Sequence, residues 1–129
     1  MIDIQLRGIE EAMAKLGVAE SIEMLRPPME RSMLLLMADM AKYPRQRSGS
    51  RYRRTGTLGR RWTKSVRADY GGLTGAVGNN TPYGPYVQSA ERQAWMHQGV
   101  WQTDEAVAHR RQSEIVGDFE RAIQRALRG

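Results

Sequence analysis

The sequence has 129 residues, of which 40% are hydrophobic, 20 are Lys or Arg and 14 are Asp or Glu. This length suits a single domain over residues 1–129, because a second hydrophobic core would have too few residues. The lack of Cys excludes disulfides, thiolate metal ligands and a cysteine nucleophile. The net charge of +6 favours a polyanionic partner, which could be nucleic acid, a membrane surface or an acidic protein.

Two elements are predicted before the first prolines. Residues 2–6 alternate apolar and polar side chains, which is the period of a half-buried strand. Residues 9–16 then carry apolar side chains on one helical face, and Gly17 is well placed to end that helix. Residues 21–25 fit a further helical turn, after which Pro27-Pro28 is expected to break the chain.

A long helix is predicted from Pro28 to about Lys42. Core packing explains its apolar stripe better than a Met-lined ligand groove does, because Met fills irregular gaps in a core. The run Met33–Ala38 is far too short to cross a bilayer, so we expect a soluble protein without membrane contact. The stripe recurs at steps of three and four residues and comprises Met29, Met33, Leu36, Met37 and Met40.

A basic loop is predicted at about residues 44–56, where Gly, Ser and Arg dominate without periodicity, and we expect it to be mobile in isolation. Tyr52 and Trp62 interrupt a dense run of cations, a pattern typical of nucleic-acid contact. A solvated loop, or one that pairs with acids of a neighbouring subunit, is the alternative. The residues expected to face a partner or DNA are Arg45, Arg47, Arg51, Arg53, Arg54, Arg60, Arg61 and Lys64.

A β-hairpin is predicted at about residues 62–78, after a short helical turn at residues 57–61. Two alternating segments flank Gly71-Gly72, a dipeptide suited to a two-residue turn. This turn would place three cross-strand pairs on one face of the sheet, and a slip of one residue would destroy that arrangement. The expected pairs are Tyr70 with Leu73, Ala68 with Gly75, and Val66 with Val77.

The C-terminal part of the chain is predicted to turn at residues 81–87 and to finish in a long helix. Residues 88–98 fit a loop or a short helix, and residues 99–102 fit a short strand. Thr103 is placed as the N-cap of the last helix, with two acids complementing the helix dipole. This helix should run to about Leu127, with a stripe of Ile115, Val116, Phe119, Ile123 and Leu127.

Together these elements predict an α+β fold. A small antiparallel sheet with a central hairpin would pack against the Met/Leu-rich helix and the C-terminal amphipathic helix.

Catalytic and metal-binding patterns are not found. His97 and His109 lack a nearby serine elbow motif and HExxH or HxxxH spacing, and residues 55–61 lack the Lys-Ser/Thr of a phosphate loop. We therefore predict no enzyme activity, no catalytic residue, no metal and no cofactor. A small ribonuclease that uses His97 as its base is the least favoured alternative.

Two short motifs frame the hairpin, and their order carries a resemblance. Thr55-Gly56-Thr57-Leu58-Gly59-Arg60 precedes the hairpin, and Tyr83-Gly84-Pro85-Tyr86-Val87 follows it. The chain resembles the neck and tail-completion (minor tail) proteins of long-tailed, lambda-like bacteriophages, in which a TG-x-L-R segment and a Y-A/G-P-Y-V segment occupy these places. After Val87 it departs from the family, because Gln88-Ser89-Ala90-Glu91 replaces the usual Glu/Phe-Gly-Thr and Pro-rich segment.

The resemblance implies a structural virion protein without enzymatic activity, found in the host cytoplasm during assembly and then in the neck of the virion. It implies a homo-oligomeric ring, commonly a hexamer, between the connector or head-closure protein and the tail-terminator or tail-tube protein, with DNA passing through the lumen. A nucleic-acid-binding module that uses the Arg-rich segment 45–67 is the alternative.

Large aromatic residues outside the core periodicity are enriched at protein interfaces, although these would equally suit a cap on the sheet. The expected subunit interface comprises Thr55, Gly56, Leu58, Tyr83, Tyr86, Trp95 and Trp101.

Overall fold

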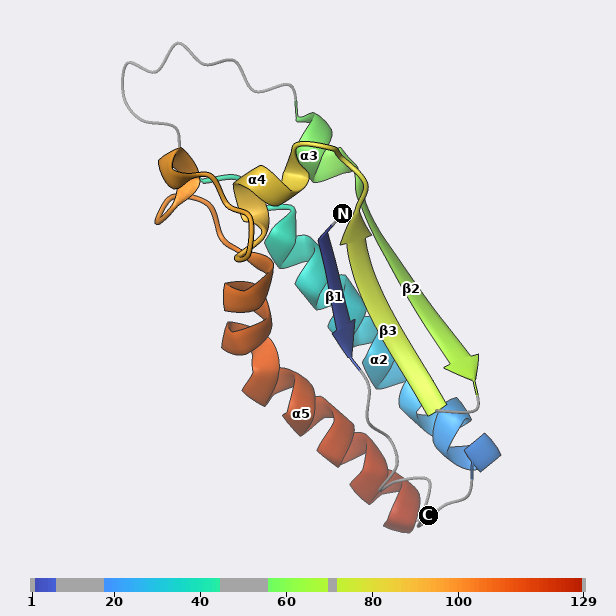
Figure 1. The fold of residues 1–129 in the computed structure, drawn as a ribbon. Helices are drawn as coiled ribbons and strands as arrows, with labels where there is room; N and C mark the ends of the chain where they lie inside the picture. Colours follow the sequence, from blue (N-terminus) through green and yellow to red (C-terminus); the bar gives the residue numbers. More distant parts are fainter. Residues whose placement is uncertain (1, 7–17, 45–55, 70–71, 129) are drawn as a thin grey trace.

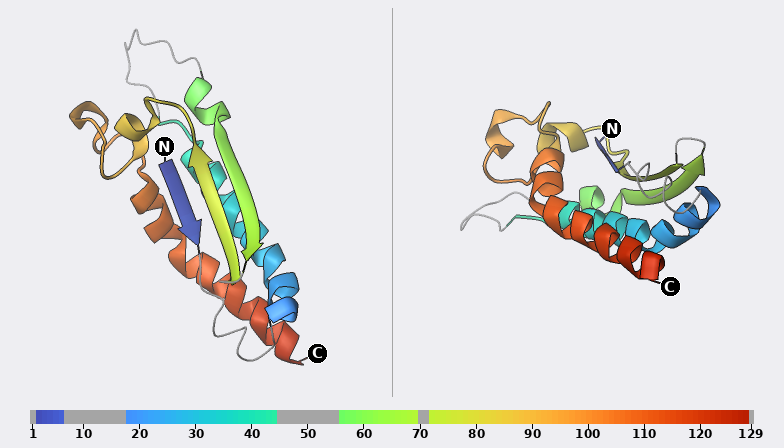
Figure 2. Two further views of the ribbon diagram at one scale, coloured as in Figure 1. Left: turned by 45° about the vertical axis from the view of Figure 1, so that its right-hand side comes forward. Right: turned by 90° about the horizontal axis from the view of Figure 1, so that it is seen from below.

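A computed structural model describes residues 2–6, 18–44, 56–69 and 72–128 of the chain. A three-stranded antiparallel sheet lies over two long antiparallel helices, α2 (Val18–Met40) and α5 (Asp104–Arg128) (Figures 1 and 2). The strands are β1 (Ile2–Leu6), β2 (Trp62–Asp69) and β3 (Gly72–Asn79), in the spatial order β1-β3-β2. Three short helices complete the described chain: α3 (Thr57–Arg60), α4 (Gly84–Gln88) and the 3₁₀ helix η1 (Trp95–His97). The predicted α+β class is confirmed.

Helix α2 supplies the largest share of the core. Met29, Met33, Leu36 and Met40 are at most 1% exposed and Met37 is partly buried, so the predicted apolar stripe is confirmed.

The break expected at Pro27-Pro28 is wrong, because α2 runs through both prolines. Each proline removes one helical N–H donor. Leu25 before the pair and Met29 after it are both buried in the same core, and this shared burial favours one continuous helix.

The hairpin is confirmed, but its predicted register is wrong by two residues. Ala68 pairs with Leu73 and Val66 with Gly75, whereas the prediction paired Ala68 with Gly75. Asp69 and Gly72 form the last described pair, so Gly72 belongs to strand β3 and not to the turn. A shift of two residues keeps every side chain on its predicted face, because side chains alternate with a period of two.

Gly75 lies where β3 packs tightly against α2. A β-carbon at this position would lie 2.6 Å from the sulfur of Met29 and 2.8 Å from that of Met33, which is far inside van der Waals contact. Leu73 and Val77 flank Gly75 on the same buried face of the strand. The lack of a side chain at Gly75 therefore allows the central strand β3 to pack directly against the methionines of α2.

Helix α5 begins and ends close to its predicted limits. Thr103 caps it, since its Oγ1 accepts a hydrogen bond from the Ala106 N–H at 3.2 Å. The predicted stripe is partly wrong: Ile115 is buried and Phe119 and Ile123 pack against the core, but Val116 and Leu127 are 46% and 52% exposed. Val107 and Ala122 take part in the core instead.

Five further predictions concern shorter segments. The strand at β1 and the helical turn at α3 are confirmed. The strand expected at residues 99–102 is wrong, because these residues form turns and irregular backbone before the Thr103 cap. The helix expected at residues 9–16 and most of the basic loop at residues 44–56 lie outside the described residues.

Candidate assembly surface

Both motif segments lie at one end of the molecule, where α2 finishes and α5 begins. Figure 1 shows α3, α4 and the turns that follow α4 gathered at this end, with the C-terminus of α5 at the other. The contacts within this end decide which side chains are fixed inside the subunit and which are presented to solvent.

The first motif segment is anchored by Leu58, which is 4% exposed. Gly56 precedes it with a φ of 79°, a left-handed conformation that favours glycine. The Leu58 carbonyl accepts a hydrogen bond from Asn79 Nδ2 at 2.8 Å, and Asn79 Oδ1 accepts one from the Thr81 N–H at 2.9 Å. Buried Asn79 thus ties the segment before the hairpin to the segment after it.

The second motif segment is fixed by two glutamines. Gln88, fully buried, donates from Nε2 to the Met40 carbonyl at 3.0 Å and so holds α4 against the end of α2. Gln93 Nε2 lies within hydrogen-bonding distance of three carbonyls in the irregular segment 87–101: those of Val87 at 2.7 Å, and of His97 and Trp101 at 3.2 Å each. These bonds give the segment a defined backbone without a strand or a long helix.

Large apolar side chains project from this frame into solvent. Trp95 is 80% exposed and Tyr86 is 56% exposed, although hydrogen bonds among neighbouring residues hold the backbone around them. Exposed aromatics on a fixed backbone bind a partner at a low entropy cost. We call the exposed side chains of this end the aromatic surface; they are Tyr83, Tyr86, Trp95, Met96 and Val100.

The structure separates the residues predicted to form the subunit interface. Tyr83, Tyr86 and Trp95 are exposed, as an interface requires. Leu58 is buried within the subunit, and Trp101 is partly buried with its ring edge-on to Tyr43 at a centroid distance of 5.1 Å. Leu58 and Trp101 therefore shape the surface from inside. Gly56 is partly buried at the start of α3, and Thr55 lies outside the described residues.

The predicted basic residues are also divided. Arg60 and Arg61 are exposed at the end that carries the aromatic surface. Lys64 lies on β2 and pairs with Glu30 of α2, with 3.3 Å between Nζ and Oε2. The other five, Arg45, Arg47, Arg51, Arg53 and Arg54, lie outside the described residues.

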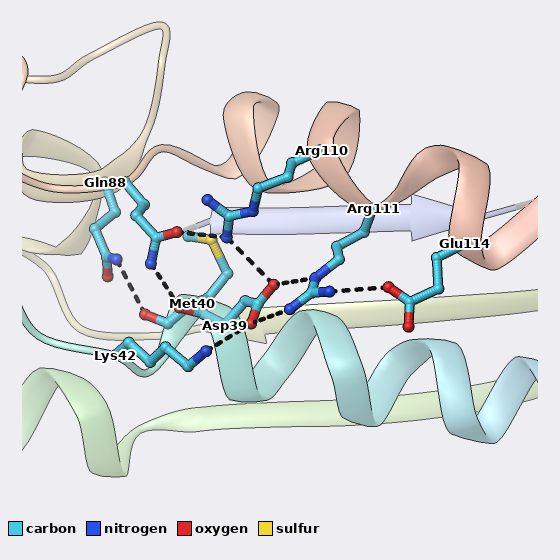
Figure 3. A network of polar contacts seen from close by, with 8 residues as sticks. Asp39, Met40, Lys42, Gln88, Arg110, Arg111 and Glu114 are labelled. Carbon is cyan, nitrogen blue, oxygen red and sulfur yellow. Dashed lines mark hydrogen bonds and ion pairs between the residues drawn. The ribbon is translucent and has the colours of Figure 1, made fainter.

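A buried carboxylate on α2 joins this helix to α5 through ion pairs, at the same end of the molecule (Figure 3). Asp39 of α2 has a side chain only 2% exposed, and its two oxygens accept hydrogen bonds from Arg111 Nε at 2.6 Å and Arg111 Nη2 at 3.1 Å. Lys42 and Arg110 also contact the carboxylate, at 3.2 and 3.3 Å. The Arg111 guanidinium holds the pKa of Asp39 well below its usual range, and burial opposes this only in part.

The stretch between η1 and α5 joins the same network through Gln102. Its Nε2 donates to the Asp39 backbone carbonyl at 3.0 Å, and its Oε1 accepts a hydrogen bond from Arg110. Asp39 therefore links α2, α5 and the chain that leads from η1 into α5. Sequence reasoning missed this role, as it missed Asn79, Gln88 and Gln93. The signal that could have revealed Asp39 is that it is the only charged residue in the otherwise apolar run of residues 33–40.

The two histidines lie apart from each other in the fold, on η1 and α5. His97 lies edge-on to Trp101 with 6.5 Å between ring centroids, and His109 is exposed on α5. Among the described residues, no three His, Cys, Asp or Glu side chains cluster as metal ligands would. None of the described helices is long and apolar enough to cross a membrane.

Comparisons of the chain with protein-family models, with curated proteins and with solved structures gave no match.

Proposed function

We propose that this chain is a structural, non-enzymatic virion protein of the phage head–tail neck. In this role it assembles into a ring that joins the tail to the capsid connector. The observation that carries the proposal is the aromatic surface, which the described part of the chain leaves open to solvent. Burying such side chains against another subunit removes apolar area from water and stabilises an assembly.

The position of the two motif segments supports the same proposal. The segments that resemble the phage family fold into the end of the molecule that carries the aromatic surface. Asn79 joins them directly through its hydrogen bonds to Leu58 and Thr81. A contact between this end of one copy and a different face of the next is head-to-tail, and such contacts close into rings when the rotation permits.

Mass photometry of the purified chain, alone and with its neighbouring connector and tail proteins, tests the proposal. We expect a ring in at least one mixture, and its loss in the double variant Tyr86→Ser with Trp95→Ser. The matched control is Leu34→Ser with Leu127→Ser, which removes two side chains of similar exposure, 53% and 52%, from other surfaces. The control should still assemble, and circular dichroism should show that both variants are folded.

Two results would contradict the proposal. One is a wild-type chain that stays monomeric with every neighbouring protein added. The other is a Tyr86/Trp95 variant that assembles as well as the Leu34/Leu127 control.

A further inference from the structure

A groove lined by arginines lies at the other end of the molecule, between α2 and the C-terminal half of α5. Its volume is about 430 Å³. One acid, Asp118, contributes to its lining, and the remaining side chains are four arginines and an amide. The lining residues are Arg31, Asp118, Arg121, Gln124, Arg125 and Arg128.

The only acid that lines the groove, Asp118, forms an ion pair with Arg31. Both oxygens of Asp118 accept hydrogen bonds from Arg31, each at 2.9 Å. Arg121, Arg125 and Arg128 are exposed and form no hydrogen bond or ion pair with another residue in the described part of the chain. Arg31 lowers the pKa of Asp118, and the charges of Arg121 and Arg125 add to this effect, so the groove carries a concentrated positive field.

The three arginines stand in a row along α5. Their spacing of four and then three residues places them on one face of the helix. Seven residues of α-helix rise by about 10 Å. One strand of duplex DNA carries a phosphate every 3.4 Å or so along its axis, so the row spans about three phosphates. Guanidinium groups also bind phosphate oxygens through paired N–H donors.

We propose that this groove binds the phosphodiester backbone of duplex DNA through Arg121, Arg125 and Arg128. A protein partner fits the groove less well, because no aliphatic or aromatic residue lines it to serve as the apolar anchor typical of the centre of a protein interface. An adjoining hollow, lined mainly by Met24, Pro27, Pro28, Ala122 and Ala126, does offer apolar contact, so an acidic protein segment is the alternative to separate. The proposal does not depend on the ring and concerns residues outside segment 45–67.

Fluorescence anisotropy with a labelled 20-base-pair duplex, titrated over a range of salt concentrations, tests this site. Arg121→Gln with Arg125→Gln should weaken binding about tenfold at 0.1 M salt and reduce the slope of log affinity against log salt by about 2, since each phosphate contact contributes about 0.9. The matched control is Arg26→Gln with Arg92→Gln, which removes two exposed arginines elsewhere. The double variant Arg121→Lys with Arg125→Lys should keep the salt slope, because the charge remains, but should lose part of the affinity, because Lys lacks the paired N–H donors.

Several outcomes would overturn the proposal. The groove is not a DNA-binding site if the wild-type protein does not bind the duplex at low salt. The same follows if the Arg121→Gln, Arg125→Gln variant binds no worse than its matched control. Loss of binding only in the variant Arg51→Gln, Arg53→Gln, Arg54→Gln would assign DNA to segment 45–67 instead. Polyglutamate that displaces the duplex equally well at equal charge would assign the groove to an acidic protein.

Discussion

The buried carboxylate of Asp39 gives the sharpest test of what holds the two long helices together. Replacement by Asn keeps the size of the side chain but removes the charge that Arg111, Arg110 and Lys42 contact. Breaking a fully buried ion pair costs about 3–5 kcal/mol. These cations are partly exposed and can regain water, so we expect Asp39→Asn to lower the free energy of unfolding by about 2–3 kcal/mol.

Urea unfolding followed by circular dichroism measures this loss. With an m-value of about 2 kcal/mol per molar urea, the midpoint should fall by about 1 M. Glu120→Gln removes an exposed acid from α5 and serves as the control, with an expected change within about 0.5 kcal/mol. If Asp39→Asn is no more destabilising than Glu120→Gln, the carboxylate does not hold the helices together and the reasoning fails.

The same pair of proteins has a defined pH dependence. The pKa of Asp39 is depressed in the folded state, whereas an unfolded Asp titrates near pH 3.9 or so. The stabilisation by the carboxylate is therefore complete well above pH 4 and is lost as the pH falls toward the lower folded-state pKa. The difference in unfolding free energy between wild type and Asp39→Asn should thus be constant from pH 6 to 7 and shrink between pH 4 and 2. A difference that grows on acidification would contradict this assignment.

Two further predictions concern packing and capping. Gly75→Ala should destabilise the fold by about 1–3 kcal/mol, because the added methyl collides with Met29 and Met33. Gly117→Ala, whose methyl meets only the end of the Arg121 side chain, should instead stabilise α5 by up to about 1 kcal/mol. Thermal unfolding of both variants checks this. Equal changes in midpoint for the Gly75 and Gly117 variants would refute the close approach at β3. Thr103→Ala should cost about 1 kcal/mol through loss of the α5 cap, whereas Ser113→Ala within the exposed helix should cost nothing. Equal midpoints for the Thr103 and Ser113 variants in urea would show that the cap contributes nothing.

The elements with a strong repeating pattern could be predicted from the sequence. The stripe of α2 reflects burial on one face of the helix, and burial on one face leaves a period in the sequence. The alternation at residues 2–6 likewise predicted the strand β1. The hairpin register could not be read in the same way. Whether Ala68 pairs with Leu73 or with Gly75, each side chain occupies the same face of the sheet. The alternation alone therefore cannot distinguish the two registers.

The residues of the candidate surface could be predicted from the sequence only in part, for a related reason. Tyr83, Tyr86 and Trp95 were candidates for a surface site because they are large and lie outside any core period, and the structure shows that they are exposed. Their place in an interface stays a prediction. The roles of Asn79, Gln88 and Gln93 depend on carbonyls that only the folded chain brings near, such as that of Met40, which is 48 residues away from Gln88. The continuity of α2 through Pro27 likewise depends on tertiary burial, which overrides a strong local signal.

The pairing of Lys64 with Glu30 has a consequence for how copies of this chain can meet. Strand β2 lies at the edge of the sheet and offers its outer backbone groups to any passing strand. Lys64 pairs with Val77 on the face of the sheet that packs on α2, and such an inward-facing charge is a known guard against strand addition. Addition of a further strand at the β2 edge is thereby disfavoured, so copies of this chain that meet at this edge would do so through side chains rather than through a shared sheet.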